Sequence, residues 1–456
     1  MDLVIRNGTI VTASDVFKAD VGISGEKITA IGHGLTGERE IDAEGKLVFP
    51  GMIDPHVHMA LPFGGTVSAD DFKDGTVAAA CGGVTTIIDF AIQAKGKSLA
   101  ETVEARRAEA DPDVCIDYGL HPAITDFTPE VLAEVPEMIA AGMPTFKLFM
   151  TYEGWAVDDG TLFATLEAAG ANGGMVGVHA ENYKLLMYLI ERLVAEGKTA
   201  PRYHAESRPD FCEAEAVARA ILWAEQTNSP LYFFHLSSRA GLEYIIASRD
   251  RGFPIYAETC TQYLLLTDER YDEPDFGGAK YVMSPPLRKE ADQKALWRGL
   301  ATGDIQVVGS DHCPFTMEQK RLGEEVFTKI PNGAPGVETT LPLLYSEGVG
   351  KGRISLNRLV EVFSTNPAKL FGLYPEKGTI AVGTDADLVI FDPDREVTIS
   401  VENLHMKADY TPYEGMKVKG YPVITISRGE VICEHGQFKG EAGRGRFIAR
   451  KRITRI

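Results

Sequence analysis

Hydrophobic and polar positions follow two different patterns along the chain. Between about residue 51 and residue 312, short apolar runs rich in Val, Ile, Phe and Tyr alternate with longer segments of mixed polarity. Such runs are typical of parallel strands buried on both faces, and the segments between them are typical of helices. Eight strand-like runs follow one another, at residues 51–58, 84–91, 115–123, 145–151, 175–181, 231–237, 254–264 and 305–312.

Local signals place helices between these runs. The stretch Ser98–Glu101 has the capping-box pattern, and Thr128-Pro129 combines an N-cap residue with a proline at the first helical position. Gly82-Gly83 and Gly142 stand where helices should end before the next strand. The eight strand–helix units predict an α/β protein with a (β/α)8 TIM barrel over residues 51–374.

The two ends of the chain share a different pattern. Short β-type runs separated by turn residues fill the first fifty positions and return after about residue 375. Asn7-Gly8 and Gly25 stand where hairpin turns are expected. This pattern predicts that residues 1–50 and 375–440 pair into one small β-sandwich domain. Residues 441–456 form a basic tail, which we interpret as solvated or contacting another subunit, in preference to a polyanion site.

Composition excludes several classes of function. The 456 residues are 44% hydrophobic and carry a formal net charge of −19, which disfavours a nucleic-acid partner or an anionic membrane surface. The N-terminal sequence MDLVIRNGTIVTA has no apolar core typical of a signal peptide, and no apolar run reaches the ~18 residues of a membrane span. Six cysteines lack C-x-x-C spacing and are expected to be free thiols in a reducing compartment. We therefore expect a cytoplasmic protein.

The stretch DPHVH places two histidines one residue apart at the end of a predicted buried strand. Side chains at positions i and i+2 of a strand share a face, so His56 and His58 should project together. Taken alone, such a pair is more often a surface or hydrogen-bonded feature than a metal site. The other strand ends decide between these two interpretations.

In a TIM barrel the active site lies at the carboxyl ends of the strands. At those ends the predicted strands carry Lys147, His179, His235 and Asp311, with His121 near the end of the third. His235 alone fits a core histidine, but a lysine within the apolar run TFKLFMT is costly unless it is paired or chemically altered, and a buried aspartate needs a partner. Histidines and an aspartate that converge on one rim satisfy each other when metal lies among them. We therefore predict that His56 and His58 are metal ligands.

Motifs along nearly the whole chain resemble a known family. The sequence is similar to bacterial dihydropyrimidinases and D-hydantoinases, which are cyclic amidohydrolases of the amidohydrolase superfamily. The matching stretches, which keep the family order, are GMIDPHVH, TFKLFMTYEG, VGVHAEN, FHLSS, AETCTQYLLL, MSPPLR, GSDHCPF, IPNGAPGVE and KGTIAVGTDADLVIFDP.

The resemblance implies a binuclear metal centre, usually of zinc, bridged by hydroxide and by a carboxylated lysine. Carried over by motif, His56, His58 and Asp311 hold one metal ion, whereas His179 and His235 hold the other. Lys147 bridges both as its carbamate. The chemistry is reasonable, because a buried lysine beside cations is driven towards its neutral form, which can add CO2.

The same resemblance implies a hydrolytic mechanism. The metal-bridging hydroxide attacks the ring carbonyl of a cyclic ureide, and Asp311 passes the hydroxide proton to the leaving ring nitrogen. Tyr152 donates to the developing oxyanion. Backbone groups at Ser284 and Asn332 hold the ureide edge of the ring. The product is an N-carbamoyl amino acid.

Four apolar side chains near the ends of the first and fourth strands are candidates for contacting the ring's exocyclic substituent. Leu61, Phe63 and Trp155 follow these strands, and Phe149 lies two residues beyond Lys147. They predict either an apolar or aromatic substituent or the internal packing of a lid, and the sequence does not separate these alternatives. The loop 61–72 contains glycines and could move during binding.

Other functions are compatible with parts of this pattern. Dihydroorotase-like relatives place an arginine just after the H-x-H pair, which HVHMALPF lacks, whereas allantoinase is harder to separate by sequence. A non-catalytic scaffold of the same fold is disfavoured because every ligand position is filled. The stretch GVGKGR at 348–353 lacks the spacing of a phosphate loop. The resemblance also implies a homo-oligomer, a tetramer or a dimer.

Overall fold

The protein is built around one sheet of eight parallel strands, seen in a computed structural model that describes residues 1–456. In spatial order the strands are β17 (Val307–Gly309), β16 (Ile255–Cys260), β15 (Leu231–Phe233), β14 (Met175–His179), β13 (Thr145–Phe149), β12 (Asp117–Ile124), β11 (Val84–Ile92) and β8 (Met52–Val57). The sheet closes where Val57 bridges His312 and where the His58 amide donates to the His312 carbonyl at 2.8 Å. The predicted TIM barrel is confirmed.

Three of the eight predicted strands end at least three residues before their apolar runs do, and the 231–237 run is a strand only as far as Phe233. The 254–264 run is a strand only as far as Cys260, after which Thr261–Leu265 forms helix α9. A short buried apolar run looks the same in a strand and in a helix, so its pattern could not place this boundary. The 305–312 run ends early as a strand because the chain turns sharply at Asp311, whose φ is 53°.

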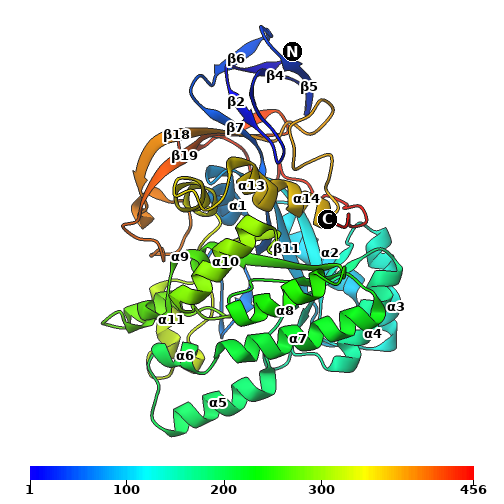
Figure 1. Ribbon diagram of the computed structural model, residues 1–456, viewed down its shortest axis with the longest axis vertical. Coiled ribbons are helices and arrows are strands. Elements are labelled where there is room, and N and C mark those ends of the chain that lie inside the picture. The colour runs from blue at the N-terminus through cyan, green and yellow to red at the C-terminus, as the bar shows by residue number, and fades with distance from the viewer.

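Helices surround the barrel in the lower part of Figure 1. They are α1 (Phe72–Cys81), α2 (Leu99–Ala110), α3 (Pro129–Ala140), α4 (Asp159–Ala171), α5 (Tyr183–Ala195), α6 (Arg202–Glu206), α7 (Asp210–Thr227), α8 (Arg239–Arg249), α10 (Glu290–Thr302), α11 (Met317–Lys320), α12 (Thr340–Leu343), α13 (Leu356–Val360) and α14 (Asn366–Leu370). The predicted Ser98 capping box and the Thr128 N-cap are present. Helix α1 ends directly before the predicted stop at Gly82, and α3 ends two residues before Gly142, with Ala141 as its C-cap.

Shorter helical turns complete the connections. Five 3₁₀ turns are η1 (Asp268–Asp272), η2 (Gly277–Tyr281), η3 (Arg321–Gly323), η4 (Phe327–Lys329) and η7 (Val401–Asn403). Two π-helical segments, η5 (Leu344–Val349) and η6 (Glu361–Thr365), extend α12 and join α13 to α14.

The two chain ends form two further sheets beside the barrel, at the top of Figure 1. One has the order β5 (Lys27–Gly32), β4 (Asp20–Ser24), β1 (Leu3–Arg6) and β6 (Arg39–Asp42). The other has the order β21 (Gln437–Phe438), β20 (Glu430–Glu434), β19 (Lys417–Ser427), β18 (Leu388–Thr398), β7 (Leu47–Pro50), β2 (Thr9–Val11) and β3 (Val16–Lys18). A separate apolar core joins residues from both ends, among them Ile10 and Ile426.

One of the two predicted hairpin turns is wrong. Gly25 does turn the antiparallel pair β4–β5, but Asn7-Gly8 connects β1 to β2, which belong to different sheets. The turn is a corner of the sandwich. Gly8 is needed there because a Cβ atom would lie 2.5 Å from Val48 Cγ2. A turn signal reports local backbone geometry, and it does not report which sheet the next strand joins.

The basic tail lies against the barrel of its own chain. The Arg446 carbonyl accepts from the Tyr118 amide at 2.9 Å, and the Ile448 amide donates to the Tyr118 carbonyl at 2.8 Å. Arg450 is buried, and its Nη1 donates to Thr145 Oγ1 at 2.9 Å. A role of the tail in subunit contacts stays a prediction.

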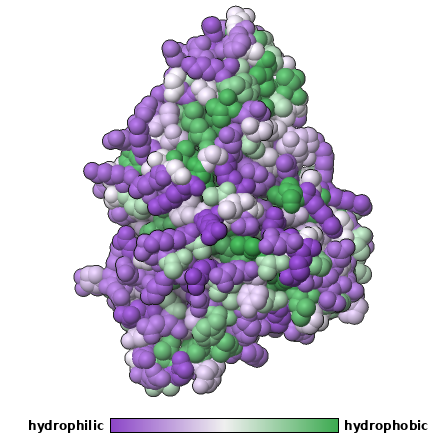
Figure 2. All heavy atoms as spheres, in the orientation of Figure 1, coloured by the Kyte–Doolittle hydropathy of each residue, from purple (hydrophilic) through white to green (hydrophobic).

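The helical part of the surface is mostly hydrophilic on the face that Figure 2 shows, whereas apolar residues form a band over the β-rich upper part. None of the helices combines the length and the apolar character needed to cross a bilayer. The apolar faces are instead turned inwards: one large core lies mainly between the barrel and its helices, and a smaller one includes barrel side chains such as Ile53 and Phe234.

Candidate active site

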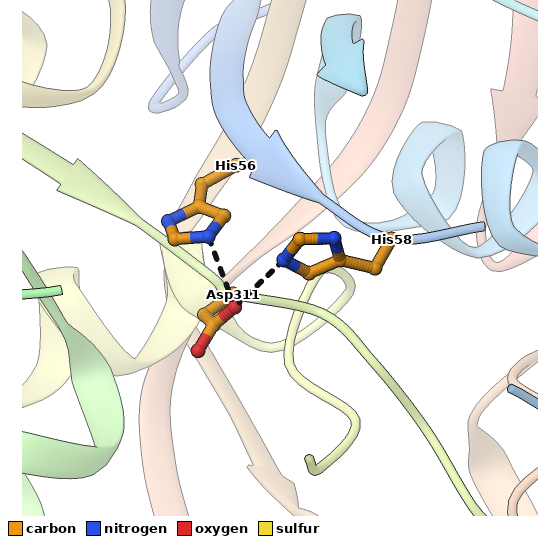
Figure 3. A group of neighbouring side chains, drawn as sticks. All are labelled: His56, His58 and Asp311. Carbon is orange, nitrogen blue, oxygen red and sulfur yellow. Dashed lines mark ion pairs between the residues drawn. The ribbon is translucent and has the colours of Figure 1, made fainter. Parts of the chain in front are cut away.

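The H-x-H pair and Asp311 meet at the carboxyl end of the barrel. Figure 3 shows both imidazoles, at the end of β8, turned towards the same Asp311 oxygen from the loop after β17. His56 Nε2 lies 3.0 Å and His58 Nε2 lies 3.3 Å from Asp311 Oδ1. One ligand atom from each residue lies within 4.8 Å of the others, so the group can hold a metal ion.

Glu258 on β16 orients this group from behind. It accepts hydrogen bonds from His56 Nδ1 at 2.6 Å, from the Tyr232 hydroxyl at 3.0 Å and from the His235 amide at 3.2 Å. With Nδ1 donating to Glu258, a neutral His56 would point a lone pair at an Asp311 oxygen. The contact therefore needs a proton or a metal ion at Nε2, and with a metal ion it is the arrangement of a carboxylate–histidine–metal site.

The electrostatics of His56 point to the same conclusion. Burial by itself lowers the pKa of His56, but the carboxylates of Asp311 and Glu258 raise it to about 9. Burial also raises the pKa of Asp311, yet His56 and His58 hold that pKa well below its usual range. The site thus stabilises a positive charge beside an ionised carboxylate, and a divalent metal can take the place of that proton.

A second group of ligands lies beside the first. His179 Nε2 donates to Glu181 Oε2 at 2.7 Å, which leaves Nδ1 as the lone-pair nitrogen, and the His179 and His235 rings have centroids 4.4 Å apart. Burial lowers the pKa of His179 to about 4, and burial together with His179 lowers that of His235. Both imidazoles are therefore neutral, as metal ligands must be.

Lys147 lies among aromatic rings and makes no ion pair. Its Nζ lies 3.9 Å from the Phe234 ring centroid and 5.3 Å from the centroids of Phe90 and Phe149. Burial lowers the pKa of Lys147 to about 7. Burial therefore favours the neutral amine, the form of lysine that can react with CO2.

The donor set as a whole fits metal ions. Two buried histidine nitrogens of the site, His56 Nε2 and His235 Nδ1, have no hydrogen-bond partner. Buried polar atoms are seldom left unpaired, so these nitrogens indicate missing ligands. Neutral imidazoles with a carboxylate are the donors that zinc prefers.

Three of the predicted site residues have a strained backbone. Tyr152, His235 and Asp311 have φ values of 75°, 41° and 53°, a region that residues with a Cβ atom adopt at a cost. Each lies just beyond the end of its strand, where the turn aims the side chain into the barrel mouth. Strain of this kind concentrates at functional sites.

One pocket is lined by every residue that the sequence analysis proposed as a metal ligand, a catalytic group or a substrate contact. It is lined by His56, His58, Leu61, Phe63, Lys147, Phe149, Tyr152, Trp155, His179, His235, Ser284, Asp311 and Asn332, together with Cys313 and Gly333. On one side, Asn332 Nδ2 donates to Ser284 Oγ at 3.1 Å. On the other, the Phe63, Phe149 and Trp155 rings pack together, with centroids 5.0–5.5 Å apart.

Comparison with known proteins identifies the family. The sequence model of the amidohydrolase family matches residues 47–432. The chain belongs to the amidohydrolase family. Family members are metal-dependent hydrolases, and in this amidohydrolase the His56, His58 and Asp311 group is a candidate metal site.

Individual relatives of this amidohydrolase match it along its whole length. It is 49% identical to the D-hydantoinase of Geobacillus stearothermophilus, over 99% of this chain and 97% of that one. It is 48% identical to the D-hydantoinase of Ralstonia pickettii, with 99% of each covered. The crystal structure of dihydropyrimidinase from Brevibacillus agri matches with a TM-score of 0.99 and 48% identity over 100% of both chains.

Sequence reasoning missed several residues of the amidohydrolase site. Glu258 lies in the predicted seventh strand, for which no ligand was expected, although a carboxylate inside an apolar run was a visible signal. Cys313 and Gly333 gave no signal of their own. His121 does not line the pocket, because its ring bonds the Thr145 hydroxyl at 2.6 Å and the Pro55 carbonyl at 3.1 Å.

Proposed function

We propose that the protein hydrolyses the cyclic amide bond of hydantoins and dihydropyrimidines to give N-carbamoyl amino acids. One observation carries the proposal: a single pocket combines the histidine, lysine and aspartate set with Tyr152, the Ser284–Asn332 pair and an aromatic wall. Relatives matched over the whole chain are D-hydantoinases.

The ligand set is proposed to hold two divalent metal ions, of which zinc fits the donors best. His56, His58 and Asp311 would hold one ion, and His179 and His235 the other. Lys147 would reach both after its neutral amine adds to the carbon of CO2 and loses a proton, which gives an anionic carbamate. When bound, such ions lower the pKa of a water molecule and polarise a substrate carbonyl.

Asp311 is proposed as the proton carrier. It is ionised at neutral pH, because His56 and His58 hold its pKa low despite burial. A carboxylate in this position accepts the proton of the attacking water and then delivers it to the ring nitrogen as the C–N bond breaks. The strained backbone at Asp311 keeps the carboxylate at the barrel mouth.

Tyr152 is proposed to stabilise the oxyanion. Burial raises the pKa of its phenol, so the hydroxyl stays protonated and can donate a hydrogen bond. The Arg208 guanidinium lies 5.8 Å from the Tyr152 ring centroid and pairs with Glu181. This packing holds the ring beside His179, whose centroid is 5.1 Å away.

The pocket is proposed to select neutral rings with apolar substituents. Backbone groups at Ser284 and Asn332 would hold the ureide edge, and Leu61, Phe63, Phe149 and Trp155 would contact the exocyclic group. Lys147 is the one lysine or arginine among the lining residues. A substrate carboxylate such as that of dihydroorotate would therefore meet no free cation.

A substrate panel tests this proposal. Purified protein supplied with zinc is offered 5-phenylhydantoin, dihydrouracil, allantoin and dihydroorotate, and the ring-opened products are identified by mass spectrometry. We expect turnover of the first two rings. Turnover of allantoin or dihydroorotate alone would contradict the proposed substrate class while leaving the metal site intact. Metal-loaded protein that opens no ring would indicate a non-catalytic protein.

Glu258 provides a prediction about the metal site. In Glu258→Gln, the amide can turn its NH2 group towards His56 Nδ1, which disturbs the tautomer that presents Nε2. Because partners that orient metal ligands contribute about 10–100-fold to affinity, we expect metal affinity to fall by about that factor. Chelator titration, followed by metal analysis of the protein, measures it. The exposed Glu243→Gln is the control, and equal affinities in both variants would refute the role of Glu258.

Assembly and location are also proposals. We propose a homo-oligomer, a tetramer or a dimer, in the cytoplasm, with a small-molecule substrate and without a nucleic-acid or membrane partner. The net charge of −19 argues against a nucleic-acid partner, and six buried cysteines without disulfides support a reducing compartment. The homo-oligomer rests on the family resemblance. Light scattering of the purified protein tests the oligomeric state.

A further inference from the structure

Lys320 is a buried lysine without a carboxylate partner. It ends helix α11, and its Nζ donates to the carbonyl oxygens of Val282, Pro331 and Gly333 at 2.8, 2.6 and 2.7 Å. Burial lowers the pKa of Lys320 to about 7, so the site is costly for the charged form. An ammonium carries three donors, and here all three are used on buried acceptors.

The three carbonyls belong to two segments that reach the pocket. One segment, 282–284, ends at Ser284, and the other, 331–333, contains Asn332. The segments touch directly: the Gly333 amide donates to the Val282 carbonyl at 3.0 Å, and Asn332 bonds Ser284 through their side chains. No other hydrogen bond reaches the carbonyl oxygens of Pro331 and Gly333.

The 331–333 segment has little room to shift without disturbing the pocket. Gly333 has a φ of 149°, and a Cβ atom there would lie 2.3 Å from the Cys313 carbonyl. Both residues line the pocket. A change in the position of this backbone is therefore passed on to the pocket wall that carries Asn332.

Helix α11 is itself fixed to the other side of the pocket. Gln319 Nε2 donates to Thr66 Oγ1 at 2.8 Å and to the Val67 carbonyl at 2.7 Å. These residues form β10, which pairs with β9 (Pro62–Phe63) in a short hairpin. The hairpin carries Phe63, so α11 connects the aromatic wall to the two segments that Lys320 holds.

We propose that Lys320 is a positioning residue that sets the spacing of the two backbone segments meant to hold the ureide edge of the ring. The proposal rests on the proposed function, and it assigns no contact between Lys320 and the substrate. Without the ammonium, the carbonyls of Pro331 and Gly333 lose their donor and turn towards other partners. The amide and carbonyl groups at Ser284 and Asn332 then no longer match the ring.

The test compares Lys320→Met with wild type and with Lys329→Met. Lys329 is an exposed lysine of the neighbouring turn η4, so K329M shows the effect of replacing a lysine that makes none of the three hydrogen bonds of Lys320. Two quantities are measured on zinc-loaded protein: kinetics with 5-phenylhydantoin and dihydrouracil, and hydrogen–deuterium exchange of peptides covering 282–284 and 331–333. We expect K320M to raise KM about tenfold, since one lost buried hydrogen bond is worth about a factor of ten. The loss in kcat should be smaller, and exchange in both segments should be faster.

Three other outcomes would overturn the proposal. Unchanged exchange would show that Lys320 does not hold the segments. Faster exchange with an unchanged KM would show that Lys320 only stabilises the fold. A wild-type protein that opens neither ring would refute the proposed function, and the positioning role with it, whatever the exchange result. If K320M does not fold, K320Q retains two N–H donors and should give a smaller rise in KM.

Discussion

Asp311→Asn gives a folded protein whose kcat for ring opening falls by at least about a thousandfold. The amide keeps the shape of the carboxylate but cannot accept the proton of the attacking water or return it to the ring nitrogen, and positioned acid–base groups contribute about 10²–10⁴-fold. The change also removes a proposed metal ligand, which adds to the loss. Steady-state kinetics with 5-phenylhydantoin, together with metal analysis, separates the two effects.

The control for this variant is Asp394→Asn. Asp394 lies on the surface, with its side chain 82% exposed, and pairs with Lys419. Its removal should leave kcat and metal content unchanged, because exposed ion pairs contribute little. If D311N retained wild-type kcat with full metal content, the proton-carrier role of Asp311 would be wrong.

Lys147→Met removes catalysis without weakening the fold. Lys147 is buried among aromatic rings with no ion pair, and an apolar side chain of similar length suits that environment better than an amine does. The thermal midpoint of the metal-free variant should therefore equal or exceed that of metal-free wild type. Metal content should fall well below that of wild type, and ring opening should be lost, because no carbamate can form.

Intact-protein mass spectrometry adds a direct readout of this lysine. Under native conditions, wild type should carry the mass of one CO2, and K147M should not. K329M, which changes an exposed lysine, should behave as wild type. A stable, metal-loaded and active K147M would contradict the proposed bridge, whereas an unstable K147M would mean that Lys147 acts mainly in packing.

The barrel could be predicted from sequence because its strands lie in runs of mostly apolar residues, a direct consequence of burial on both faces. The boundaries that failed have physical causes. Tyr263 and Leu264 are as buried in α9 as they would be in a strand, so hydrophobicity alone could not end β16. Asn7-Gly8 makes a tight turn, but the strands on either side of it, β1 and β2, pair with strands of two different sheets. The turn is therefore a corner of the sandwich and not a hairpin.

The site could be predicted because TIM barrels bring strand ends together, which joins His56 and His58 to Asp311, more than 250 residues away. The division of ligands between two metal ions came from family resemblance and not from spacing. Glu258 and Lys320 were missed for a different reason. The carboxylate of Glu258 inside an apolar run was a local signal, but the roles of both residues depend on which imidazoles and carbonyls face them after folding.

Metal removal and restoration shows whether ring opening depends on metal ions in the proposed site. Purified protein is stripped with a chelator, and ring opening of 5-phenylhydantoin and dihydrouracil is measured before stripping, after it, and after addition of zinc with and without bicarbonate. We expect no activity in the stripped protein and recovery that needs zinc and is faster with bicarbonate. Undiminished activity in protein shown to contain no metal would refute a metal-dependent mechanism.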